Sequence, residues 1–142
     1  MTREQRLLRF NAFLITIPFG ILFAAGAWPP IYDLLRFFFV FVHWPFNPAP
    51  EVLEPTARLL IAIGGGVAAG LGAATWMVAT HVLPVAPEAG RRVLFAAGGT
   101  WFVTDSTFSV VAGSPMNVVP NVVLLAMLVG PSLMAAREDR AA

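Results

Sequence analysis

The chain has 142 residues, of which 58% are hydrophobic and 12% are charged, and its formal net charge is +1. Soluble domains carry about twice this share of charged residues, so the composition excludes an ordinary soluble fold and predicts a single membrane domain over residues 1–142. So small a net charge gives no electrostatic basis for binding nucleic acid. The sequence has no Cys and no Lys, which excludes disulfides, thiolate metal sites and Schiff-base chemistry on Lys.

Four apolar stretches are long enough to cross the roughly 30 Å hydrocarbon core of a bilayer as helices. They cover residues 10–28, 59–83, 93–112 and 116–134. The chain is therefore predicted to be an all-α membrane protein, a four-transmembrane-helix bundle embedded in the lipid bilayer.

The first stretch also has features of a signal peptide, because an Ala-Gly-Ala motif at 25–27 follows an apolar core. Pro18 and Gly20 interrupt that core, however, and the Trp-Pro pair at 28–29 suits a cleavage site poorly. We therefore expect residues 1–27 to be retained as part of the first span.

The arginines orient this bundle. With four spans and a cytoplasmic N-terminus, seven of the nine arginines lie on the cytoplasmic side and two on the outer side. This asymmetry follows the positive-inside rule and predicts a multi-pass protein with both termini in the cytoplasm. Abundant Ala, Gly, Pro and Arg without Lys is typical of a GC-rich bacterial genome, so we expect the bacterial inner (plasma) membrane. The cytoplasmic set is Arg3, Arg6, Arg9, Arg91, Arg92, Arg137 and Arg140, and the outer set is Arg36 and Arg58.

Residues 31–46, between the first two predicted spans, form a shorter aromatic and apolar segment. A fifth span here would leave four arginines on each side of the membrane and abolish the charge asymmetry. We therefore expect an interfacial helix on the outer side, where Tyr32 and Trp44 suit the headgroup level. Asp33 and Arg36 can pair on this helix at the i,i+3 spacing.

The second predicted span is rich in glycine, and Gly66 and Gly70 form a G-x-x-x-G pair within it. Small residues on one helix face allow a second helix backbone to approach closely, which is a main source of helix association in lipid. Two interpretations follow: tight helix packing within the monomer, or a face for homo-oligomerisation.

The third and fourth predicted spans form a tight hairpin, because only Gly113, Ser114 and Pro115 separate them. Gly113 is expected to end the first helix in the left-handed conformation. Ser114 is expected to cap the next helix, and Pro115 suits its first turn.

A polar intramembrane cluster is expected across this hairpin. Asp105 and Ser109 are spaced i,i+4 on the third span, and Asn117 and Asn121 have the same spacing on the fourth. Asp105 lies about 13 Å before the turn and Asn121 about 10 Å after it, at a rise of about 1.5 Å per residue. The depths therefore pair Asp105 with Asn121 and Ser109 with Asn117.

This cluster has a functional and a structural interpretation. An Asp at mid-membrane costs roughly 3 kcal/mol, and intramembrane ionisable groups usually serve function, which favours a proton or cation site. Alternatively, Asp105 holds the hairpin together by hydrogen bonds. Such bonds average only about 0.6 kcal/mol, so we favour the functional interpretation.

The sequence offers little else for chemistry. It has no nucleophile–base pair, no H-E-x-x-H motif and no phosphate loop, so we expect no enzyme activity. His43 and His81 are predicted on opposite sides of the membrane, where they cannot share one metal or haem. We therefore expect no metal site and no cofactor.

The segment from Trp101 to Ser109, reading W-F-V-T-D-S-T-F-S and followed by Gly113, Asn117 and Asn121, resembles a pattern in uncharacterised small bacterial multi-span membrane proteins. The resemblance covers the third and fourth predicted spans. It implies a multi-span membrane fold in which the Asp-Ser-Thr segment matters, and it implies no activity.

Two functional hypotheses remain from the sequence. The first is a non-enzymatic accessory or assembly subunit of a larger membrane complex, whose partners are other membrane protein subunits. The second is a small transporter or channel that works as a homo-oligomer, with Asp105 as its proton or cation site. A transporter needs a water path to Asp105 lined by Thr100, Thr104, Ser109 or Asn117.

Overall fold

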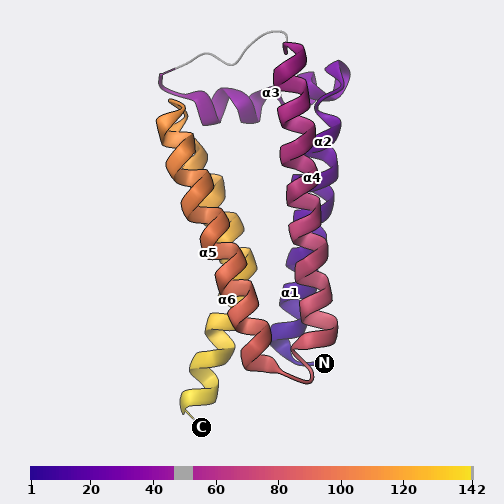
Figure 1. Ribbon diagram of the computed structural model, residues 1–142, viewed down its shortest axis with the longest axis vertical. Coiled ribbons are helices and arrows are strands. Elements are labelled where there is room, and N and C mark those ends of the chain that lie inside the picture. Colours follow the sequence, from indigo (N-terminus) through magenta and orange to yellow (C-terminus); the bar gives the residue numbers. More distant parts are fainter. Residues whose placement is uncertain (47–52, 142) are drawn as a thin grey trace.

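The computed structural model describes residues 1–46 and 53–141, and every regular element in these two ranges is a helix. Figure 1 shows two long helical columns joined at one end and spread apart toward the other, with a short helix running across the spread end. Both termini lie at the joined end. In chain order the elements are α1 (Arg3–Leu14), η1 (Ile15–Ile21), α2 (Leu22–Ala25), α3 (Pro29–His43), α4 (Pro55–Met77), η2 (Val78–Val82), α5 (Pro87–Val111), η3 (Pro115–Asn117) and α6 (Val118–Ala141).

Three helical runs in the described residues are long and apolar enough to cross a membrane: Arg3–Ala25, Pro55–Val82 and Pro115–Ala141. The prediction of a helical membrane protein is therefore supported, and the prediction of four spans only in part. Helix α5 has 25 residues and a length of about 37 Å, which exceeds the roughly 30 Å thickness of the hydrocarbon core. Its hydropathy is lower because Asp105 and several Ser and Thr residues lie between positions 100 and 109.

The first column pairs α4 with the continuous run of α1, η1 and α2, and glycines bring the two backbones together. A Cβ atom added at Gly20 would lie 2.6 Å from the Cα atom of Ala69. A Cβ added at Gly65 would overlap the backbone of Ala24, and one added at Gly72 would overlap Thr16. These three glycines are therefore required by the close approach of the helices.

Gly66 and Gly70, the pair singled out from the sequence, do not contribute to this contact. Among residues 1–46 and 53–141, no atom outside their own helix lies within 4 Å of a Cβ added at either position. The interpretation that this pair packs within the monomer is therefore wrong. The helix turns 100° per residue, so the face that meets the α1–η1–α2 run contains Gly65 and Gly72, while Gly66 and Gly70 point away from it.

Residues Ile15–Ile21 and Val78–Val82 are π-helical, with wider turns than an α-helix. Pro18 lies inside the first of these segments. Proline lacks the backbone N–H and its ring clashes with the preceding turn, and a π-bulge is one way a helix accommodates that loss. The first run therefore stays continuous past Pro18.

Helix α3 begins at Pro29, whose fixed φ suits the first turn of a helix, and it crosses the spread end of the molecule (Figure 1). Tyr32, Phe39 and Val42 are buried. The centroid of the Phe39 ring lies 5.2 Å from the ring centroid of Tyr32 and 5.4 Å from that of Phe23. The helix also packs against η3. It thus bridges the two columns, while Leu34 and Phe37 remain exposed.

The joined end is held by a buried ion pair. Arg91 at the start of α5 donates to both carboxylate oxygens of Glu4 in α1, at 3.0 and 2.8 Å, and to Asp139 in α6 at 2.7 Å. The Arg91 and Glu4 side chains are only 13% and 7% exposed, so this bidentate pair is shielded from water. The hydrogen bond with Glu4 raises the pKa of Arg91 above its ordinary value.

The turn between α5 and α6 matches one expectation and corrects another. Gly113 has φ 78°, the left-handed conformation, and the Ser114 amide donates to the Ser109 carbonyl at 2.9 Å. The expected Ser114 cap is wrong, because its side chain makes no capping hydrogen bond. Ser114 has φ −122° and ψ 58°, outside the extended conformation that an N-cap needs, since its own amide closes the preceding helix.

Candidate functional site

The structure brings Asp105, Ser109, Asn117 and Asn121 into one hydrogen-bonded cluster across the α5–α6 hairpin. The amide of Asn121 donates to Oδ2 of Asp105. The amide of Asn117 donates to the same oxygen at 3.2 Å and to the hydroxyl of Ser109 at 2.9 Å. The pairs expected from depth, Asp105 with Asn121 and Ser109 with Asn117, are therefore in contact.

Ser106 belongs to the same cluster, although the sequence analysis did not single it out. Its hydroxyl accepts a hydrogen bond of 3.1 Å from Asn121, and both residues are buried. The i,i+4 spacing places Asp105 and Ser109 on one face of α5. Asn121 contacts this face and also Ser106, which lies about 100° farther around the helix. Ser106 could have been identified from the sequence because it directly follows Asp105 and lies on the side of α5 that faces α6.

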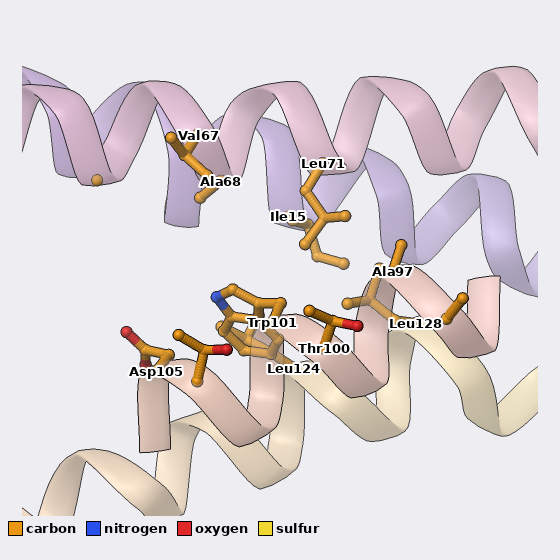
Figure 2. Close-up of a pocket in the computed structure, with 13 residues that line it drawn as sticks. Ile15, Val67, Ala68, Leu71, Ala97, Thr100, Trp101, Asp105, Leu124 and Leu128 are labelled. Carbon is orange, nitrogen blue, oxygen red and sulfur yellow. The ribbon is translucent and has the colours of Figure 1, made fainter. Parts of the chain in front are cut away.

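The carboxylate of Asp105 is bound by amides and not by a cation. Within the described ranges no arginine pairs with it, and both hydrogen bonds that it accepts end on Oδ2. Figure 2 shows the side chain directed toward the space between the two columns. Asp105 is partly exposed, and within the described ranges its Oδ1 atom accepts no hydrogen bond.

That space is a cleft of about 810 Å³ between α4 and η1 on one side and α5 and α6 on the other (Figure 2). The α5 wall carries four polar or amphipathic side chains, from Thr100, Trp101, Thr104 and Asp105. The opposite wall is apolar and is built from Ile15, Gly64, Val67, Ala68 and Leu71.

The cluster therefore has two sides with different environments. Ser106 and Asn121 are buried against the hairpin partner helix. Ser109 and Asn117 lie nearer the hairpin turn and do not line the cleft. Asp105 is the member of the cluster that lines the cleft. The amides of Asn117 and Asn121 hold this carboxyl in place, which leaves it pre-oriented toward any occupant.

The two histidines lie apart from this cluster. His43 ends α3, and its Nδ1 atom is 2.8 Å from the Phe39 carbonyl oxygen. His81 lies in η2 at the other end of the molecule and is exposed. Over residues 1–46 and 53–141, no three His, Asp or Glu side chains come together as a set that could hold a metal ion.

Comparison of this chain with protein-family models, with curated proteins and with solved structures finds no match.

Proposed function

We propose that this protein is a non-enzymatic accessory or assembly subunit of a membrane complex, and that its cleft receives an apolar helix of a partner subunit. The observation that carries the proposal is the asymmetry of the cleft. One wall is apolar and includes Gly64 and Ala68, and the other presents a single oriented carboxyl group at Asp105.

The proposed topology places four helices across the inner membrane, with both termini in the cytoplasm. In this topology α5, the third span in chain order, also crosses the membrane. It lies antiparallel to α6 along its length, and many of its polar side chains face α6 or the cleft. The spread end then lies on the outer side, where α3 rests at the interface with Leu34 and Phe37 in lipid. The arginine distribution supports this orientation.

A helix suits the cleft for reasons of shape and solvation. Gly64 and Ala68 are one turn apart on α4, and small residues at that spacing let a second helix approach closely. A hydroxyl, amide or basic donor on the incoming helix could pair with Oδ1 of Asp105. Docking would also remove the carboxyl from contact with lipid, where an unpaired polar group is costly.

The second hypothesis, a homo-oligomeric transporter or channel, is favoured by one observation. Asp105 is partly exposed on the cleft, and Thr100 and Thr104 line the same wall, as a proton or cation path would require. The opposite wall offers no polar side chain to continue that path. This asymmetry is the reason for preferring the accessory function.

Site-specific crosslinking tests the proposal. The photocrosslinking amino acid p-benzoylphenylalanine would replace Ala68, which lines the cleft, or Ala74, which is exposed on the same helix outside it. We expect crosslinks to one heterologous membrane protein from position 68 and none from position 74. Asp105→Asn or Asp105→Leu should reduce them. Crosslinks from both positions alike would refute docking in the cleft.

Ion flux in liposomes separates the two hypotheses. Purified protein without a partner is expected to carry no proton or monovalent cation current. A flux that requires Asp105, together with crosslinks only between copies of this chain, would replace the accessory function with the transporter.

A further inference from the structure

A second groove lies on the outer face of the first column, away from Asp105. It has a volume of about 270 Å³ and runs between η1 with the end of α1 and the last turns of α4. Its lining is apolar apart from one hydroxyl and one indole: Phe13, Thr16, Ile17, Ala73, Trp76 and Met77. Phe13 and Met77 are each 55% exposed, so the groove opens to the surroundings of the column.

A cation lies at one end of this groove. The Cζ atom of Arg9 is 4.5 Å from the centroid of the Trp76 ring, a cation–π contact that fixes the guanidinium beside the groove. Arg6 lies one turn earlier on α1 and is exposed. Both arginines belong to α1, which begins at the N-terminal end of the chain, and the two termini lie at the same end of the molecule (Figure 1).

The hydrogen-bonding capacity of Arg9 is largely unused. Its Nη1 atom lies 3.3 Å from the sulfur of Met1, which is a weak acceptor. No carboxylate in the described part of the chain pairs with Arg9 or Arg6, whereas Arg3, Arg91 and Arg92 all have acidic partners there. The planar guanidinium of Arg9 thus presents donors to an anion from outside the chain.

We propose that this groove binds an anionic phospholipid, with the phosphate on Arg9 and one acyl chain along Phe13, Ile17 and Met77. Charge complementarity argues for this occupant, because a phosphate supplies the acceptors that Arg9 lacks and an acyl chain covers the apolar lining. Arg6 gives a second positive charge at headgroup level. The site is independent of the cleft and of the function proposed for it.

The test is a lipid titration of the full-length protein, purified in detergent and followed by native mass spectrometry. The probes are phosphatidylglycerol and phosphatidylcholine with identical acyl chains. Both lipids carry the phosphate, but the choline ammonium of phosphatidylcholine cancels its charge. Phosphatidylglycerol, which keeps a net negative charge beside Arg9 and Arg6, is therefore expected to bind about tenfold more tightly. Arg9→Gln should abolish this preference. Arg92→Gln removes the same charge at the same end and should leave it unchanged.

Filling the groove provides a second variant that keeps every charge. Ala73→Phe should weaken binding of both lipids, while Ala74→Phe, on the same helix outside the groove, should not. Equal affinity for the two lipids, or equal losses in Arg9→Gln and Arg92→Gln, would overturn the proposal. Displacement of phosphatidylglycerol by inorganic phosphate as readily as by free phosphatidylglycerol would show a simple anion site and overturn it as well.

Discussion

The two helix pairs of this molecule are held together in different ways. In the pair formed by α4 with α1, η1 and α2, glycines at 20, 65 and 72 let the backbones touch. In the α5–α6 pair, the amides of Asn117 at the end of η3 and Asn121 in α6 bind a carboxyl and two hydroxyls on α5. Lipid supplies no hydrophobic force between helices, so either close packing or hydrogen bonding must hold each pair.

This difference separates a pair held by backbone packing from a pair that contains a carboxyl group. The contacts of Gly20, Gly65 and Gly72 are with the backbone and side chains of Ala69, Ala24 and Thr16, and none of them involves a carboxyl group. The hydrogen-bonded pair keeps a carboxyl group inside the helical region, and Asp105 lines the cleft that lies between the two pairs. We therefore expect the proposed partner helix to pair with Asp105 on the polar pair, while the first column supplies the apolar wall of the cleft and the separate lipid groove.

The largest effect is expected from blocking the backbone contact. Gly65→Leu should lower the free energy of unfolding by about 3 kcal/mol, because its side chain would overlap the backbone of Ala24. Gly66→Leu is the matched control, since no other helix in the described part of the chain comes within 4 Å of its Cβ position. Both changes gain the same helix propensity, so reversible unfolding in detergent isolates the packing cost. Equal losses would contradict this account of the first pair.

A smaller effect is expected in the polar pair. Asn121→Leu should cost about 1 kcal/mol, because it removes donors from Asp105 and from the buried Ser106 hydroxyl. Asn117→Leu should cost less, since Asn117 is partly exposed near the hairpin turn. The same unfolding assay measures both variants. A greater loss in Asn117→Leu would show that the hairpin turn, and not the buried part of the cluster, holds the pair.

The smallest effect concerns a link between the two pairs. Pro131 has no amide hydrogen to offer the carbonyl four residues before it, and the side chain of Asn11 in α1 donates to that Met127 carbonyl at 2.8 Å. Asn11→Ala should cost about 0.6 kcal/mol. In a Pro131→Ala background, where a backbone donor is restored, the same change should cost almost nothing. A double-mutant cycle that shows no coupling would contradict this role of Asn11.

The sequence predicted the polar contacts better than the packing contacts. Four polar residues at i,i+4 spacings on either side of a three-residue turn are constrained in depth by helix geometry alone, so their partners follow from counting. The glycines of α4 occupy nearly every face, and composition does not say which face meets α1. The structure selects Gly65 and Gly72, while Gly66 and Gly70 stay open.

The sequence by itself predicted a helical membrane protein with four apolar spans, and three of these coincide with helices long and apolar enough to cross a membrane in residues 1–46 and 53–141. It also predicted the left-handed Gly113 and the pairing of Asp105 with Asn121 across the hairpin. These depend on local composition and on the helical repeat. Only the tertiary structure decided that the columns separate into a cleft, that α3 bridges their spread end, and that Arg91 joins α1, α5 and α6. Those features depend on contacts between residues as far apart as Glu4 and Arg91, and local patterns contain no information about which distant side chains meet.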